Sequence, residues 1–464
     1  MKTTSMNDLL EAVLFGEKIG ADYVELRSEE SFRTLITTKD GRVEIIREGF
    51  ESGASIRVLT QGAWGFVSTS KTDKQSVFKA VEDAYRLALA SSQRIKEKIK
   101  LAEVKPLKDK AIAKPKKDPR NISVEQKTED ILSIDKTIFR LSPQTKSCTI
   151  DYLDFLEKEF YVNNEGAKIE QQKTYVWFRV YATASEAEVF ASASEEFGST
   201  SGYDIFDKKT PEEIGKEVSK RLSEQLKAKT PKGGIFPAVL GSNVVGVFVH
   251  EAFGHLAEAD LTLSGSVILD KLGKKVASSI VTIFDDGTIK GAFGSFKYDD
   301  EGVKTQKTLL VKDGVVVGLM HNRETAARFN TQPTGNARAE NFRHTPIIRM
   351  RNTYLQPKDH SFEELLEPIK FGYYLKTFRG GQANLDGTFH VGVQEAYEIV
   401  KGKIGKPVRN LSISGNTLET LMKVEAVGKD FRLWPGRCGK GQIAFVCDGG
   451  PPIRVGEIQV GGRG

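Results

Sequence analysis

The sequence predicts an α+β protein: a duplicated helix–sheet–helix N-terminal half followed by a mainly β C-terminal domain that carries one distinctive buried helix. Three observations lead to this prediction. Two stretches of the N-terminal half can be aligned with each other, strand and turn signals dominate beyond residue 231, and an apolar helical segment near residue 250 holds two closely spaced histidines. We expect an N-terminal α+β domain at residues 1–230 and a C-terminal domain at residues 231–464.

The composition is that of an ordinary globular protein. The chain has 464 residues, of which 39% are hydrophobic and 28% charged, and this length predicts two or three domains and excludes a disordered or fibrous chain. The net charge of +6 comes from one segment, residues 94–120, with nine Lys and two Arg against four acidic residues. Prolines and a lack of aromatic residues indicate that this segment is a solvated linker and no nucleic-acid groove.

The cysteine count and the apolar segments predict a cytoplasmic protein. Three cysteines provide no disulfide framework, which is typical of a reducing compartment. Charged residues interrupt the first apolar segment, which therefore does not resemble a signal peptide. The longest apolar stretch, Ile235 to Val249, is interrupted by Ser242 and Asn243 and is too short to span a bilayer. We expect no membrane association.

The first N-terminal unit begins and ends with a helix. Residues 5–20 form an amphipathic helix in which Ser5 and Asp8 make a capping box and Gly20 provides the stop. Strand-like runs follow, and Asp40-Gly41 between two of them predicts a hairpin. A second helix at about 74–90 completes the unit.

The same order of elements recurs after the lysine-rich segment. We expect a helix at about 123–139, strands with a turn at Glu165-Gly166, and a helix at about 212–228. Three pairs of segments align at an offset of about 125 residues: KDGRVE with NEGAKIE, SIRV with WFRV, and GFVSTS with VFASAS. We interpret this as an internal duplication; the alternative is that two similar α+β patterns arose independently.

The helix expected at about 243–259 carries the most informative motif. His250, Glu251 and His255 form the pattern H-E-x-x-x-H in a chain with only six histidines. In the related zinc motif H-E-x-x-H, histidines at i and i+4 lie about 40° apart on one helix face, whereas a spacing of five residues separates them by about 140°. A shared metal ion therefore requires a widened, π-type turn, which Gly254 would tolerate. In a regular helix the two rings would point apart and bind no common ion.

A catalytic zinc needs a third protein ligand, and the residues alone leave the choice open. Glu258 and Asp260 follow His255 closely, while Cys438 lies in the glycine-rich sequence PGRCGKGQ. Neighbouring cations favour the thiolate form of Cys438, so Cys438 and Glu258 compete. Cys148 and Cys447 are interpreted as inert core residues.

Other motifs carry little information. The sequence has no Walker A motif, no strand-linked G-x-G-x-x-G and no G-x-S-x-G. The polar residues Arg338, Asn341 and Arg343 could line a cleft, but we interpret them as a solvated turn. His321, His344, His360 and His390 are interpreted as structural.

Several motifs in consistent order resemble those of the TldD/PmbA family of cytoplasmic metallopeptidases, on the TldD side. The resemblance covers nearly the full length. Its motifs are HEAFGHLAEAD, NTYLQP, GYYL, GGQANLDGTF, CGKGQ and PPIRVGEIQVGG.

The resemblance implies that His250, His255 and Cys438 bind one zinc ion per chain in the C-terminal catalytic domain, and that Glu251 is the general base. It also implies hydrolysis of unfolded or short peptides, and a heterodimer with a TldE/PmbA-like paralogue that lacks the metal site; a homodimer is the other arrangement. It identifies no substrate-binding residue. The alternative function is a non-catalytic partner or adaptor of a peptidase complex.

Overall fold

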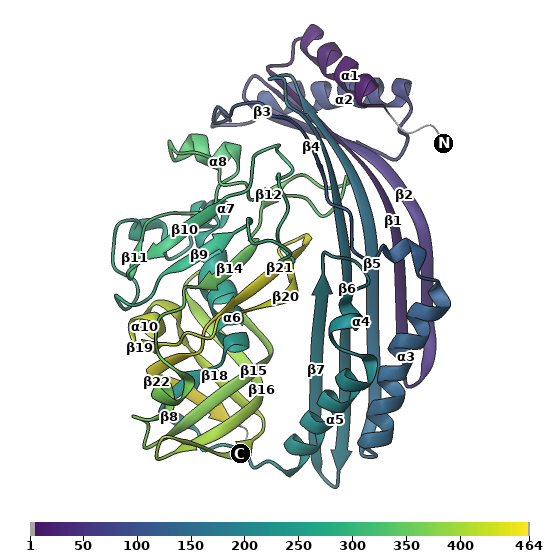
Figure 1. The fold of residues 1–464 in the computed structure, drawn as a ribbon. Helices are drawn as coiled ribbons and strands as arrows, with labels where there is room; N and C mark the ends of the chain where they lie inside the picture. Colours follow the sequence, from purple (N-terminus) through teal and green to yellow (C-terminus); the bar gives the residue numbers. More distant parts are fainter. Residues whose placement is uncertain (1–4, 463–464) are drawn as a thin grey trace.

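A single sheet of long strands forms the N-terminal half (Figure 1). The structure, a computed structural model, describes residues 5–462. The sheet has the order β3-β2-β1-β5-β6-β4, and β7 also pairs with β6. Its strands are β1 (Tyr23–Lys39), β2 (Arg42–Thr60), β3 (Ala63–Thr69), β4 (Lys108–Ile112), β5 (Thr145–Asn163), β6 (Lys168–Glu186) and β7 (Val189–Ser199).

The duplication predicted from the sequence is present in the topology. The first unit reads helix, three antiparallel strands, helix, and the second unit repeats this order. The first strands of the two units, β1 and β5, pair with each other along an antiparallel ladder from Glu25↔Asn163 to Lys39↔Thr149. The two units therefore share one continuous sheet. At the predicted hairpin, Asp40 and Gly41 both have positive φ, 52° and 76°, as a tight two-residue turn requires.

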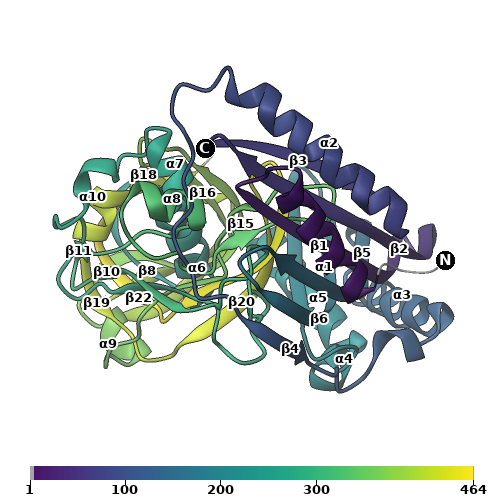
Figure 2. The same cartoon turned by 90° about the horizontal axis from the view of Figure 1, so that it is seen from above.

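Each unit buries its own pair of helices against the sheet. The helices of this half are α1 (Met6–Lys18), α2 (Lys74–Ser92), α3 (Val124–Leu141), α4 (Ile205–Lys208) and α5 (Pro211–Lys227). α1 begins at the predicted Ser5–Asp8 capping box. α1 and α2 cover one end of the sheet, and α3 and α5 the other (Figures 1 and 2).

The lysine-rich segment contributes a strand that the linker prediction did not include. β4 pairs in parallel with the start of β6, from Lys108↔Lys168 to Ile112↔Gln172. Lys108 and Lys110 stay exposed, which suits the edge of a sheet because charged side chains discourage further strand pairing.

Two sheets and a small ribbon make up the C-terminal half. A six-stranded sheet has the order β11-β10-β9-β14-β21-β20. A second sheet runs β15-β8-β22-β18-β16-β17, and pairing of β15 with β16 closes it into a barrel. Its strands are β8 (Gly234–Leu240), β9 (Ile283–Asp286), β10 (Lys307–Lys312), β11 (Val315–Val316), β12 (Ala337–Arg338), β13 (Ile347–Ile348), β14 (Asn352–Leu355), β15 (Phe371–Ala383), β16 (Thr388–Val400), β17 (Lys403–Val408), β18 (Leu411–Asn416), β19 (Val424–Val427), β20 (Arg432–Gly439), β21 (Ile443–Gly450) and β22 (Ile453–Gly462).

One buried helix, α6, follows the first strand of this half. The helices are α6 (Ser242–Val249), α7 (Ala259–Leu263), α8 (Arg323–Arg328), α9 (Phe362–Leu366) and α10 (Thr417–Met422). The apolar side chains of α6 are buried in the core shared with the barrel. On another side, Gly246 lies so close to β21 that a Cβ there would be 2.6 Å from the backbone nitrogen of Gly449. The fold thus holds α6 at a fixed depth.

The two halves meet through buried aromatic and charged side chains. Tyr175 of the N-terminal sheet stacks on Phe445 of β21, and the Phe155 ring packs against Phe445 at an angle. Arg57 of β2 lies 2.8 Å from Glu25 and 2.9 Å from Glu301 of the C-terminal half. Within residues 5–462, no helix has both the length and the hydropathy needed to cross a bilayer.

Candidate metal centre

The helix that carries the histidines widens where the motif begins. α6 ends at Val249, and residues His250–Gly254 form a π-helical turn in which the His255 N–H donates to the His250 carbonyl. This five-residue step brings the two imidazole rings together, with centroids 5.4 Å apart. The widened turn predicted from the spacing is therefore confirmed, but the predicted continuous helix over 243–259 is interrupted here.

The structure explains the glycine at position 254 differently from the sequence-based prediction. Its φ of −56° and ψ of −49° are ordinary right-handed helical values, so the backbone does not need glycine there. A Cβ at this position would lie 2.1 Å from Sδ of the buried Met350. Close packing, and not backbone strain, explains the glycine.

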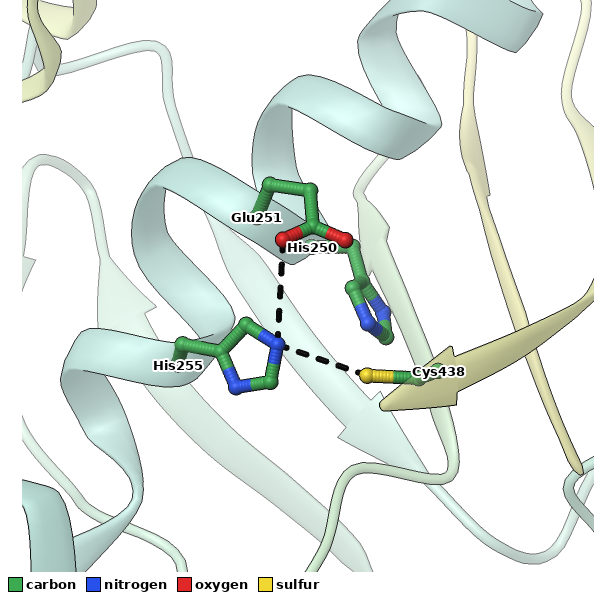
Figure 3. Close-up of side chains that lie close together, drawn as sticks. All are labelled: His250, Glu251, His255 and Cys438. Atoms are coloured by element: carbon green, nitrogen blue, oxygen red, sulfur yellow. Dashed lines mark hydrogen bonds and ion pairs between the residues drawn. The ribbon is translucent and has the colours of Figure 1, made fainter. Parts of the chain in front are cut away.

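Cys438 comes to the histidines from the β20–β21 hairpin. Its Sγ lies 3.3 Å from Nε2 of His255, and a carboxylate oxygen of Glu251 lies 3.8 Å from the same nitrogen (Figure 3). One possible ligand atom from each of His250, Glu251, His255 and Cys438 lies within 4.8 Å of the others. No second group of this kind is found within residues 5–462.

Glu258 and Asp260 lie outside this group. The fully buried Glu258 carboxylate is 2.8 Å from Nδ1 of His255, the ring nitrogen that faces away from Cys438. Lys440 binds both acids, with Nζ 3.2 Å from Glu258 and 2.8 Å from Asp260. A carboxylate that accepts the Nδ1 proton fixes the ring orientation and leaves Nε2 free as a ligand.

The ionisable groups of the cluster shift one another's pKa values. Burial alone would raise the pKa of the Cys438 thiol, but the charge of His250 and hydrogen bonds with both histidines lower it to about 4. Burial lowers the pKa of both imidazoles, yet contacts with Cys438 raise it to about 9 for His250, and contacts with Cys438 and Glu258 raise it to about 10 for His255. A thiolate beside two protonated rings is an arrangement in which a metal cation can replace the protons.

The donor set fits zinc. Two imidazoles and one thiolate are nitrogen and sulfur ligands of the kind that zinc takes in catalytic sites, with one position left open. The His250 Nδ1 atom is buried and has no hydrogen-bond partner among the described residues, so the protein itself leaves a polar atom in the cluster unsatisfied.

Sequence reasoning did not identify Asp448, which lies beside the cluster. Its Oδ1 is buried without a hydrogen-bond partner among residues 5–462 and faces α6, 2.4 Å from where a Cβ on Gly246 would lie. Burial, with smaller contributions from the acidic groups Glu251 and Glu196, raises its pKa to about 7 although His250 opposes the shift. The available signal was an acidic residue at the end of the apolar run QIAFVC.

Three further predictions concern residues outside the cluster. Cys148 and Cys447 are buried, as predicted, and burial raises the pKa of the Cys447 thiol to about 12. The solvated-turn interpretation is wrong for Arg338. It is only 6% exposed and donates to the carbonyls of Met350 and Phe445, because the chain folds the apparent turn beneath the β20–β21 hairpin.

Family models for metallopeptidases match almost the whole chain. The PmbA/TldA metallopeptidase domain 1 matches residues 24–88, the central domain residues 117–226, and the C-terminal domain residues 233–462. The last match contains the complete cluster.

Relatives of known sequence and structure agree with these matches. A metalloprotease of Methanothermobacter thermautotrophicus is 38% identical, and the alignment covers 98% of this chain and 99% of that protein. A zinc metalloprotease TldD homolog of Saccharolobus solfataricus is 35% identical over 96% of this chain and 98% of its own length. The crystal structure of TldE from Thermococcus kodakarensis has the same fold, with a TM-score of 0.80 at 18% identity over 98% of this chain and all of that one. The chain belongs to the PmbA/TldD family of metallopeptidases.

Proposed function

We propose that this protein is a zinc metallopeptidase of the TldD type, in which His250, His255 and Cys438 hold one zinc ion and Glu251 is the general base. The observation that carries the proposal is the convergence of these four side chains within 4.8 Å. The convergence depends on the π-helical turn, a local distortion of a kind that clusters at functional sites.

The protein side chains divide the work of hydrolysis. A zinc ion held by these residues would supply a Lewis acid that lowers the pKa of bound water and polarises a carbonyl. Glu251 follows His250 directly but is partly exposed, with 32% of its side chain accessible. It can therefore reach water on the open side of the cluster, accept its proton and deliver that proton to the leaving amine. Glu258 keeps the His255 ring oriented through Nδ1.

The proposed substrate is an unfolded or short peptide. β20, which carries Cys438, is the edge strand of the six-stranded sheet. An extended peptide could pair with this edge through main-chain hydrogen bonds, which would place it next to the cluster and make recognition largely independent of sequence. An unfolded or short peptide has its main chain free for such pairing, whereas most main-chain groups of a folded protein are already paired.

The proposed partner is a TldE-like paralogue. The support is the near-complete fold similarity to TldE of Thermococcus kodakarensis, together with the presence of all four cluster residues in this chain. In such a heterodimer this chain would be the metal-binding subunit.

Three variants test the proposal. Glu251→Gln is expected to keep stoichiometric zinc and to lose hydrolysis of an unstructured peptide, because only the proton acceptor is removed. His255→Ala and Cys438→Ala are expected to lose both zinc and hydrolysis. Cys148→Ala, which removes a thiol in the N-terminal half, is the control. If Cys438→Ala retained stoichiometric zinc, the proposed ligand set would be wrong. If wild-type protein held zinc but cleaved no peptide, alone or with a TldE-like chain, the non-catalytic alternative would stand.

A further inference from the structure

A small cavity lies behind the hairpin that carries Cys438. Its volume is about 100 Å³, room for a group of a few heavy atoms. Arg437 and Phe445, which face each other across the hairpin, both line it. Because successive side chains on a strand point to opposite faces, Arg437 turns away from the metal cluster when Cys438 turns toward it. Phe155 and Tyr175 of the N-terminal sheet, whose rings contact Phe445, also line the cavity.

Positive charge dominates the lining. Five cationic side chains and three acidic ones border the cavity. The acidic groups already have partners. Lys173 lies 3.8 Å from Glu157 and 3.2 Å from Asp300, and the Glu340 carboxylate accepts the backbone N–H of Ile443 at 2.6 Å.

Three of the arginines have no carboxylate within ion-pair distance among the described residues. Arg338, Arg349 and Arg437 form no ion pair with a carboxylate among residues 5–462. Two of these arginines are buried, Arg338 at 6% and Arg349 at 1% exposure. Buried guanidinium groups are normally paired with an anion, because removing a charge from water is costly.

Arg349 provides the most direct indication of a ligand. It donates at 2.7 Å to the Cys438 carbonyl and at 2.5 Å to the Gln442 carbonyl. Its Nε, although buried, has no hydrogen-bond partner among the described residues. An unsatisfied buried N–H of a charged group is rare in folded proteins, and this one belongs to a side chain that lines the cavity.

Arg437 lines the same cavity and is in contact with solvent. Its side chain is exposed, and its guanidinium lies 4.8 Å from the Trp177 ring centroid. No hydrogen bond fixes its donors among residues 5–462. Arg349 therefore offers its unpartnered Nε–H, and Arg437 offers its guanidinium donors. Guanidinium groups are well suited to bind oxyanions.

We propose that this cavity binds a small oxyanion, a carboxylate or a phosphate group, held by Arg338, Arg349 and Arg437. The anion would lie beside the hairpin that positions Cys438, because Arg349 lines the cavity and donates to the Cys438 carbonyl. None of the three arginines belongs to the group of candidate metal ligands, and the proposal does not depend on peptidase activity.

Binding of inorganic phosphate to the zinc-loaded full-length protein, measured by calorimetry at constant ionic strength, tests the proposal. We expect saturable binding to the wild type, about tenfold weaker binding to Arg437→Gln, and loss of binding in Arg349→Gln. Arg47→Gln, which removes an exposed arginine of β2, is the matched control and should bind like the wild type. Phosphate that binds zinc directly would bind all four proteins alike.

Arg437→Gln keeps the test decisive if Arg349→Gln fails to fold, since Arg437 is exposed and makes no hydrogen bond among the described residues. No saturable binding to the wild type, or equal affinity in wild type and Arg437→Gln, would overturn the proposal.

Acetylglycine and acetylglycine amide distinguish the sources of the anion. Competition with phosphate by the acid alone would support a peptide carboxylate, and phosphate binding without competition would support a free anion.

Discussion

Protons on individual side chains determine how tightly the centre can hold a metal. The pKa of His250 is raised to about 9 and that of His255 to about 10, so at pH 7 both rings carry a proton in the metal-free protein. The pKa of Cys438 is lowered to about 4, so its thiol is already ionised. Zinc requires neutral imidazole and thiolate and must therefore displace the histidine protons.

The protons on both rings predict that zinc binding depends on pH. Zinc affinity should rise as the pH increases toward 9 to 10 and fall below that range, and binding at pH 7.5 should release about two protons. Calorimetry in two buffers of different protonation enthalpy counts the released protons. Binding without proton release would show that the rings are already neutral, contrary to their contacts with Cys438 and Glu258.

The carboxylate behind His255 offers a second prediction. Glu258→Gln is expected to weaken zinc binding by about 10- to 100-fold, because the Nδ1 proton loses its charged acceptor. Asp260→Asn is the matched control: Asp260 shares Lys440 with Glu258 but makes no hydrogen bond to His255 within residues 5–462. A chelator competition assay measures both affinities. Equal zinc affinity in the two variants would remove Glu258 from its positioning role.

The single residues also show what sequence could and could not reveal. The spacing of His250 and His255 predicted a widened turn because no other helix geometry brings their rings together. From the residues alone the choice between Cys438 and Glu258 stayed open, because the sequence does not show which side chain turns toward both histidines; only the family resemblance favoured Cys438. Asp448 was missed because its neighbours come from α6, the π-helical turn and β7, far away in sequence.

At the level of elements, the contact between α6 and β21 sets the position of the widened turn. Glycine to alanine inside a helix normally stabilises it by about 1 kcal/mol. A Cβ at Gly246, however, would meet backbone of Gly449 at 2.6 Å and the Asp448 carboxylate at 2.4 Å, and backbone atoms cannot move aside as a flexible side chain can.

We therefore predict that Gly246→Ala destabilises the protein by about 1–3 kcal/mol and weakens zinc binding, since α6 must shift away from β21 one turn before His250. Gly49→Ala is the control because a Cβ there meets nothing within 4 Å. Thermal unfolding and zinc titration measure the two effects. A variant as stable as the wild type would show that α6 is not held at a fixed depth.

The hydrophobic periodicity of the sequence predicted where helices occur more accurately than where they end. The helix expected at 74–90 is α2, Lys74–Ser92, and the one expected at 123–139 is α3, Val124–Leu141, because capping residues mark their starts. The helix expected at 243–259 ends at Val249. Its apolar pattern continues through the π-helical turn, so the sequence predicted the distortion from the histidines but not the break in the helix.

At the scale of the whole molecule, we expect buried ion pairs between the two halves to hold the halves in a fixed relative position. Arg57 contacts both Glu25 and Glu301, and the second oxygen of Glu301 accepts the Arg323 N–H at 2.8 Å. Glu301→Ala should cost about 3–5 kcal/mol, because it leaves a buried charge incompletely paired. Arg86→Ala, which removes an exposed ion pair with Glu82, should leave the melting temperature unchanged. Calorimetry distinguishes the two, and a loss below 1 kcal/mol for Glu301→Ala would exclude this role.

The overall assembly of the halves was the least predictable part of the fold. The repeat indicated two similar units, yet nothing local specifies that β1 and β5 pair with each other. Their ladder joins Glu25 to Asn163, and no short turn sets a register over such a separation. The strand in the lysine-rich segment, β4, was not predicted for the same reason, since its partner β6 begins far along the chain.

The most direct test of the account is the zinc K-edge X-ray absorption spectrum of the purified protein. We predict one sulfur at about 2.3 Å and two imidazole nitrogens at about 2.0–2.1 Å from the zinc ion, with the sulfur absent in Cys438→Ser. A wild-type spectrum without sulfur, or one that keeps its sulfur in Cys438→Ser, would contradict the proposed centre.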